Sequence, residues 1–260
     1  AGVKAPSEII TYVSAHDNQT LWDKLAETMP QADEKERMRL NRMAAALYMT
    51  CQGSLFLLSG EEFARTKDGL EDSYNAPIAI NRLDWEQAWK NRDLVDYYRG
   101  LLALRRQLPG LCDKSARAAE RISHVQKEKG AVSFVIDNRP WVPVCQKGET
   151  GDAPELEGKA HKNRWQTLKI VYNSSREERP VTLDGEGWKV LCDWQDSWLW
   201  KTDRPAQGKM CIAPQSVLIL GQDGNTAEAE TIETTEATEA AGTAEHQHRG
   251  EETTWRKKAV

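Results

Sequence analysis

The 260-residue sequence lacks several features that define whole classes of protein. No apolar run reaches the roughly 18 residues that a membrane-spanning helix requires, so we expect no membrane partner. Lys and Arg (35) are outnumbered by Asp and Glu (40), which gives a formal net charge of −5. A surface that binds phosphates needs clustered positive charge, so nucleic acid is not an expected partner either.

The sequence also has no recognisable cofactor or metal motif. No phosphate loop, dinucleotide fingerprint or G-x-S-x-G nucleophile turn occurs in it. The cysteines are scattered and never spaced C-x-x-C, which argues against a zinc site or a disulfide framework; they are Cys51, Cys112, Cys145, Cys192 and Cys211. We therefore predict no cofactor and no metal, and we interpret the cysteines as reduced thiols.

Phenylalanine is scarce, with 3 residues against 10 tryptophans. Trp rings fill hydrophobic cores, and their amphipathic rings also suit binding surfaces such as the faces of sugars. Composition does not separate these two uses.

The first residues, AGVKAPSEII, include neither an initiator Met nor the basic start and apolar core of a signal peptide. We therefore expect the chain to begin within a longer one. Its compartment stays open: free cysteines slightly favour the cytoplasm, whereas the acidic, Thr-rich tail resembles linkers of exported proteins.

The first 112 residues alternate between strand and helix patterns. Residues 8–15 (EIITYVSA) carry apolar side chains at both parities, which predicts a strand covered on both faces, as in a parallel sheet. An apolar stripe predicts a helix over residues 33–51, and SLFLLSGEEF predicts a second buried strand. A further helix is predicted from Asp93 until Pro109 and Gly110 stop it. This order is typical of a parallel α/β fold.

The pattern changes near residue 113. HVQKEKGAVSFVIDN predicts a hairpin that turns at Lys129 and Gly130, and four more short strands follow between Gly, Asn, Asp and Pro turns. We predict an antiparallel β-sandwich, with residues 146–163 as a long loop. From Gln222 onward the chain is rich in Thr, Glu and Ala and predicts a disordered, solvated tail that includes His246 and His248.

Polar side chains follow both predicted strands of the first region. His16, Asp17 and Asn18 stand after the first strand, where barrel enzymes gather functional groups, although Asp and Asn are equally at home in turns and caps. After the second strand, adjacent Glu61 and Glu62 point to opposite faces, so one hydrogen-bonded and one exposed carboxylate is favoured over an acid/base pair.

The loop that follows suits the recognition of a polyol, since it offers polar groups and one ring: Arg65, Lys67, Asp72, Ser73, Tyr74 and Asn75. These residues by themselves do not define a reaction.

Several stretches resemble type I pullulanases and limit dextrinases, which are glycoside hydrolases of family 13. YVSAHDNQTLWDKL is similar to the last conserved region of these enzymes. GSLFLLSGEEFARTK, DSYNAPIAINRLDW and YYRGLLALRRQLPGL resemble their final barrel strand, substrate loop and last helix. LKIVYNSS through PQSVLIL resembles the β-sandwich after the barrel. The resemblance extends to about residue 221, with its motifs in the family's order and separation.

The resemblance implies a fold class of α/β plus all-β. Residues 1–112 would be the last two strand–helix units of a (β/α)8 barrel, residues 113–221 a C-terminal antiparallel β-sandwich, and residues 222–260 the tail. A complete barrel takes about 250 residues. The family's nucleophile Asp and general acid Glu lie on earlier strands, so we expect a C-terminal fragment that is inactive alone.

The activity implied is hydrolysis of α-1,6-glucosidic linkages in pullulan, amylopectin and limit dextrins, with retention of configuration. By the resemblance, Asp17 is the carboxylate that stabilises the transition state and His16 donates to the sugar. Asn18, Arg65, Tyr74 and Asn75 would line the substrate groove. The expected partner is therefore an α-glucan.

Two alternatives stay open. One is another α-glucan enzyme, such as an isoamylase or a glycogen debranching enzyme. The other is a non-catalytic glucan-binding module that uses the sandwich tryptophans Trp188, Trp194, Trp198 and Trp200. The simpler interpretation is that these rings pack in the core and in loops.

Overall fold

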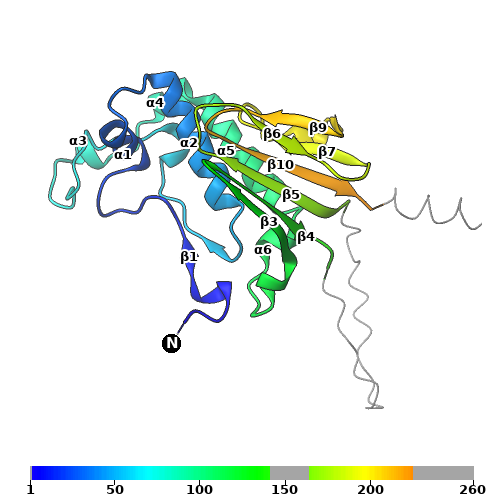
Figure 1. Ribbon diagram of the computed structural model, residues 1–260. Helices are drawn as coiled ribbons and strands as arrows, with labels where there is room; N and C mark the ends of the chain where they lie inside the picture. Colours follow the sequence, from blue (N-terminus) through cyan, green and yellow to red (C-terminus); the bar gives the residue numbers. More distant parts are fainter. Residues whose placement is uncertain (1, 141–163, 225–260) are drawn as a thin grey trace, which may run out of the picture. The chain divides into compact units, whose positions relative to one another are not determined.

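A computed structural model describes residues 2–140 and 164–224, in which helices cover one face of a six-stranded antiparallel sheet (Figure 1). The described residues up to Asp223 belong to a single compact unit. The predicted loop 146–163 lies outside the described residues, as does nearly all of the predicted tail; strand β10 (Ser216–Asp223) includes the first two tail positions. None of the helices in the described ranges is long and apolar enough to cross a membrane.

The first region contains a parallel pair of strands with two helices between them. Strands β1 (Ile10–Thr11) and β2 (Ser54–Leu55) pair in parallel, and α1 (Leu21–Thr28) and α2 (Glu34–Met49) connect them. The predicted parallel strand–helix–strand order is confirmed.

The predicted burial of the first strand on both faces is wrong. Strand β1 has only two residues, and the side chains of Ile10 and Tyr12 are 61% and 54% exposed. Within the described residues β1 pairs only with β2, so no strand pairs with its second edge. Phe56, after β2, is likewise 42% exposed and touches the Tyr12 ring edge-on, with centroids 6.0 Å apart.

The helices begin at side-chain caps that the local sequence supplies. The Thr20 hydroxyl accepts from the Asp23 amide at 3.2 Å at the start of α1, and the Asp33 carboxylate accepts from the Glu36 amide at 2.8 Å at the start of α2. Helix α2 confirms the helix predicted over residues 33–51.

Four more helices follow β2. They are α3 (Ile78–Asn81), α4 (Trp85–Lys90), α5 (Arg92–Arg105) and α6 (Pro109–Cys112). Helix α5 confirms the helix predicted from near Asp93, and Pro109 stands at the first position of α6, where a missing amide costs nothing. Short 3-10 turns are η1 (Pro6–Glu8), η2 (Glu61–Phe63), η3 (Ala118–Arg121) and η4 (Leu199–Lys201).

The second region is antiparallel, as predicted. The large sheet has the order β3-β4-β5-β10-β7-β8 and a separate pair joins β6 to β9. The bounds are β3 (Ile122–Glu128), β4 (Ala131–Asp137), β5 (Trp165–Asn173), β6 (Arg179–Thr182), β7 (Trp188–Cys192), β8 (Pro205–Ala206) and β9 (Lys209–Ile212). The β3–β4 hairpin turns at Gly130, whose φ is +79°.

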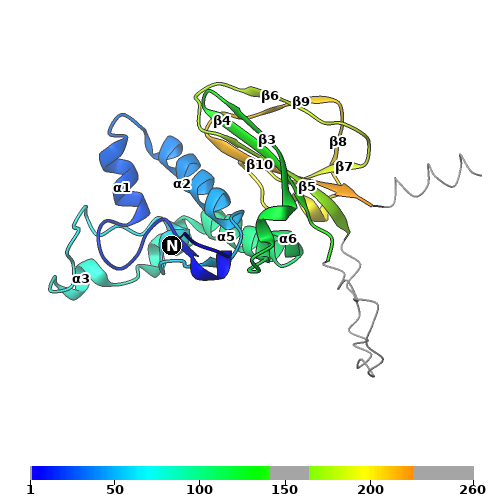
Figure 2. The same cartoon turned by 60° about the horizontal axis from the view of Figure 1, so that its bottom comes forward.

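Each face of the large sheet has its own apolar core. On one face, Leu168, Ile170 and Ile219 pack with residues of α2 and α5, including Ala45 and Leu101. On the other face, side chains of β5, β7 and β10 pack against those of the β6–β9 pair, which Figure 2 shows on the side of the sheet away from α5. The first core therefore joins residues on both sides of the predicted boundary at residue 112.

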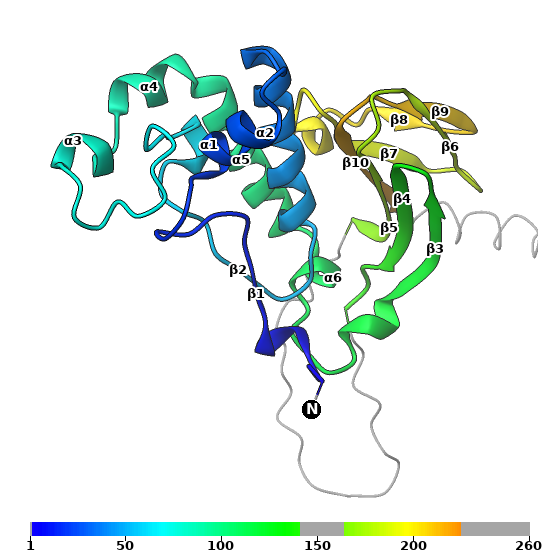
Figure 3. The same cartoon turned by 60° about the vertical axis from the view of Figure 1, so that its left-hand side comes forward.

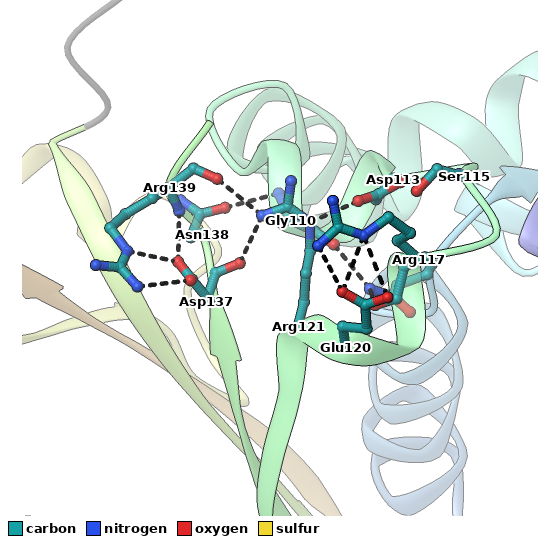
Figure 4. Close-up of polar contacts among 11 residues, drawn as sticks. Gly110, Asp113, Ser115, Arg117, Glu120, Arg121, Asp137, Asn138 and Arg139 are labelled. Atoms are coloured by element: carbon teal, nitrogen blue, oxygen red, sulfur yellow. Dashed lines mark hydrogen bonds and ion pairs between the residues drawn. The ribbon is translucent and has the colours of Figure 1, made fainter. Parts of the chain in front are cut away.

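A buried polar cluster fastens the end of the helical region to the hairpin (Figure 4). The Arg121 side chain, 4% exposed, donates to the Asp113 carboxylate at 2.5 Å and to the carbonyl oxygens of Asp137 and Arg139 at 2.9 and 2.8 Å. The Asn138 side chain accepts from the Gly110 amide at 2.9 Å. These bonds satisfy backbone groups that the turns leave without strand or helix partners.

Candidate functional site

The loop after β1 presents His16 and Asp17 to solvent. Their side chains are 84% and 74% exposed, and His16 Nε2 lies 3.5 Å from Asp17 Oδ1. Asn18 adopts the left-handed backbone region with φ +61°, which Asn tolerates better than most residues and which turns the chain sharply toward α1. The structure thus brings the three predicted residues together on one exposed corner, called here the His16 corner (residues 16–18).

Lys67 holds the His16 corner from beneath. Its Nζ donates to the His16 carbonyl oxygen at 2.5 Å and approaches the Asn18 carbonyl oxygen at 3.5 Å. Burial lowers the pKa of Lys67, and the Arg65 charge lowers it further, while the Asp17 and Asp23 carboxylates raise it. A cation is therefore fixed beside the Asp17 carboxylate by backbone contacts rather than by a direct ion pair.

Asp23 locks the same two loops together. It is 6% exposed, and its carboxylate accepts from the Lys67 amide at 2.7 Å, from the Thr20 hydroxyl at 2.9 Å and from the Thr66 hydroxyl. This role of Asp23 was not predicted from the sequence, although the Thr-x-x-Asp spacing of residues 20–23 signals a helix start. With every carboxylate oxygen engaged, Asp23 positions the His16 corner and is not available for substrate.

Glu61 is a buried structural acceptor. Its carboxylate, on a residue 3% exposed, accepts from Ser14 Oγ at 2.6 Å and from the hydroxyls of Tyr48 and Tyr98 at 3.0 and 3.1 Å. Burial raises the pKa of Glu61, and the three hydrogen bonds oppose that rise. Glu62 is half-buried and accepts from the Gly60 amide at 2.9 Å. The favoured interpretation, hydrogen bonding rather than an acid/base pair, is confirmed for Glu61; Glu62 is less exposed than expected.

The remaining predicted residues lie on the loop after η2. Arg65 donates to the carbonyl oxygens of Ser59 and Asn81 at 3.1 and 2.6 Å, so its side chain connects the two ends of its own loop. Tyr74 is 87% exposed and Asn75 is exposed. Among the contacts of the described residues, no hydrogen bond or ion pair joins Arg65, Tyr74 or Asn75 to His16 or Asp17.

The described residues hold no group of three or more His, Cys, Asp or Glu side chains arranged to bind a metal ion. His246 and His248 lie outside those residues. What the His16 corner offers chemically is an exposed carboxylate, an imidazole beside it and a buried ammonium below. Such a set binds and orients hydroxyl groups.

The fold is similar to part of several solved pullulanases. A pullulanase from Bacillus acidopullulyticus superposes with a TM-score of 0.69 at 27% identity, covering 84% of this chain and 25% of that chain. The type I pullulanase of Bacillus subtilis strain 168, solved in complex with maltose, superposes with a TM-score of 0.69 at 26% identity, covering 85% and 28%.

Sequence comparison agrees. The family model described as the pullulanase all-beta domain matches residues 154–196. The pullulanase of Bacillus subtilis strain 168 is 40% identical over 119 residues, which are 46% of this chain and 17% of that protein. The chloroplastic pullulanase 1 of Arabidopsis thaliana is 40% identical over 87 residues, 33% of this chain and 9% of that protein. The chain is similar to pullulanases and matches their C-terminal portion, though it aligns with less than a fifth of either relative.

Proposed function

We propose that the chain forms the C-terminal part of an enzyme that hydrolyses α-1,6-glucosidic linkages in pullulan and branched α-glucans. The observation that carries this proposal is the His16 corner: an exposed His–Asp pair, anchored by buried Lys67 and Asp23, in a chain related to pullulanases. The strand–helix order of residues 1–112 supports their assignment as the last two units of a (β/α)8 barrel.

In this proposal Asp17 stabilises the transition state of glycoside cleavage. The sugar ring acquires positive charge as the bond to the leaving group breaks. A carboxylate already fixed beside the ring lowers the energy of that charge without reorganising at the moment of reaction. Asp17 Oδ atoms also accept from sugar hydroxyls, and His16 donates to a neighbouring hydroxyl oxygen. Asn18, Tyr74 and Asn75 line the groove, and Arg65 holds the loop that carries Tyr74 and Asn75.

The nucleophile and the general acid of the retaining reaction are assigned to a part of the enzyme outside this chain. A retaining pair needs two carboxyl groups about 5–5.5 Å apart on either side of the scissile bond. Near the His16 corner, Asp23 and Glu61 are buried and hydrogen-bonded. Asp17 is the exposed carboxylate of the corner itself, and one carboxylate does not make a retaining site.

The first test is the release of reducing ends from pullulan by the purified 260-residue chain and by Asp17→Asn. We expect no release from either. Release by the chain that disappears in Asp17→Asn would place the reaction's other carboxylates within these residues and overturn the fragment proposal.

The second test is a hybrid enzyme in which residues 1–224 replace the matching part of the Bacillus subtilis pullulanase. We expect the hybrid to hydrolyse pullulan and Asp17→Asn in it to lower kcat by about 100-fold or more. The matched control is Glu71→Gln, an exposed acid on the loop that carries Tyr74, which should retain full activity. Equal kcat values for the two variants would refute the role of Asp17.

Two alternatives are weaker. A glycogen debranching enzyme of Salmonella typhi is 34% identical over 82 residues, covering 32% of this chain and 12% of that protein. Assays of the whole enzyme on pullulan and on glycogen would distinguish these two substrates. A glucan-binding module that uses all four sandwich tryptophans fits poorly, because Trp188 is 6% exposed and its indole donates to the Asp184 carbonyl oxygen at 2.9 Å.

A further inference from the structure

A groove separate from the His16 corner lies between the first half of α2 and the loop after β7, which lie side by side (Figure 3). Its volume is about 750 Å³, within the ~300–1,000 Å³ typical of small-molecule sites. The lining residues used below are Lys35, Met38, Arg39, Arg42, Asp93 and Trp194. The groove includes Trp194, one of the four tryptophans of the alternative glucan-binding module, but none of the residues of the His16 corner.

Arg39 and Trp194 form the centre of the groove. The Arg39 guanidinium lies over the Trp194 ring, 4.3 Å from its centroid, which fixes both side chains across the junction between α2 and the loop after β7. Among the contacts of the described residues, Arg39 makes no hydrogen bond or ion pair. Its planar set of N–H donors is therefore held in a fixed orientation without acceptors among the described residues. This geometry suits hydrogen bonds to two neighbouring hydroxyl oxygens.

A second hollow continues from the first. It has a volume of about 440 Å³, and Lys35 and Arg39 line both hollows. Glu36 and Arg176 form its far side, with Arg176 Nη2 3.2 Å from Glu36 Oε1. Two hollows joined across Arg39 make a trough that suits an extended ligand better than a single sugar ring.

The charges of the trough favour a neutral ligand. The two hollows together are lined by four acidic and four basic side chains. Arg42 Nη2 lies 2.5 Å from Asp93 Oδ2, and Arg176 is paired with Glu36. A polyanion would meet the acidic side chains, whereas hydroxyl groups both donate and accept and so match a surface of mixed sign. A Trp ring beside such polar groups is suited to the apolar face of a sugar.

We propose that this trough is a second, non-catalytic binding site for an α-glucan chain, held by Arg39 and Trp194. The choice of an α-glucan rests on the proposed function; the position of the site rests on the trough itself. The site needs both α2 and the loop after β7, so it does not belong to either predicted domain alone.

The test is affinity electrophoresis of the full 260-residue chain through native gels that contain amylopectin. We expect retardation of the wild type, and a Kd about tenfold higher for Trp194→Ala and for Arg39→Met, which keeps the packing on the ring but removes the donors. The matched control is Trp89→Ala, because Trp89 is 73% exposed and also carries an arginine, Arg92, 5.5 Å from its centroid, outside the trough. This control should be retarded like the wild type.

The proposal is overturned if the wild type is not retarded, or if Arg39→Met and Trp194→Ala are retarded as strongly as Trp89→Ala. Asp17→Asn separates this proposal from the proposed function. Loss of retardation in Asp17→Asn alone would assign the binding to the His16 corner, which supports the proposed function and rejects the trough. If the hybrid enzyme is inactive but the wild-type chain is still retarded, the trough is supported and the proposed function is rejected.

Discussion

At the scale of single residues, ionisable groups divide into those held for structure and those left for ligands. Glu61, Asp23 and Lys67 are 3%, 6% and 2% exposed, and each bonds with neighbours 13 or more positions away in sequence. Asp17 and His16 remain in water. Buried polar groups are costly unless hydrogen-bonded, so the first set fixes the backbone on which the second set is displayed.

The buried Glu61 carboxyl makes the stability of the fold depend on pH. Burial raises the pKa of Glu61 above its ordinary value of 4.5, so the folded state binds a proton more tightly than the unfolded state does. The stability contributed by the neutral form is present below pH 4.5 and is lost as pH rises through the raised pKa.

We expect the free energy of unfolding of the wild type, relative to Glu61→Gln, to fall as the pH increases from 4.5 upward and then to level off. Urea denaturation of both proteins at a series of pH values measures the difference. A difference that does not vary with pH, or that rises with it, would contradict the raised pKa. Glu62→Gln, beside it and half-buried, is the control.

At the scale of elements, the sheet and helices meet through close backbone contacts. Gly100 in α5 faces the loop before η4, where Ser197 is fully buried and donates to the Tyr97 carbonyl oxygen at 2.8 Å. A Cβ on Gly100 would lie 2.8 Å from Ser197 Cβ and would also overlap Ser197 Oγ. The absence of a side chain at this helical position is what lets α5 approach the β-region.

Gly100→Ala should therefore destabilise the protein, by about 1–3 kcal/mol from overpacking. The same change at an exposed helical position stabilises by about 1 kcal/mol, so the sign of the effect is diagnostic. Thermal or urea unfolding measures it. Adding Ser197→Gly to Gly100→Ala should recover part of the loss, and a double variant less stable than both single variants would argue against direct contact.

At the scale of the whole described unit, one buried ion pair joins the end of helix α6 to the 3-10 turn η3, which precedes β3. Arg121 and Asp113 are 4% and 6% exposed at the side chain, and Arg121 also binds the carbonyl oxygens at the end of β4 (Figure 4). Removing one partner of such a pair leaves the other charge buried.

Arg121→Ala should lower the free energy of unfolding by about 3–5 kcal/mol. The control is Arg139→Ala, which removes an ion pair with Asp137 whose arginine is 65% exposed and should cost less than about 1 kcal/mol. Urea denaturation of the two variants provides the comparison. Equal losses would mean that the buried cluster does not hold the hairpin to the helical region.

Local patterns predicted the elements whose own residues suffice to form them. The apolar stripe and cap of α2, and Gly130 in the β3–β4 turn, act over a few residues, and both elements appear where expected. Strands β8 and β9 were not among the predicted strands. The adjacency of His16, Asp17 and Asn18 was in the sequence by itself, and a resemblance supplied their role.

Tertiary structure decided what those residues are free to do. Asp23, Lys67 and Glu61 each also bond with partners 13 to 51 positions away, and local patterns do not reveal these distant contacts. The burial predicted for residues 8–15 was wrong because an apolar strand is buried only when other segments cover it, and the described residues provide one short partner. The Arg39–Trp194 contact joins positions 155 residues apart. Sequence fixes chemistry and local shape here; the fold alone selects which groups meet, because contact depends on the path of the whole chain.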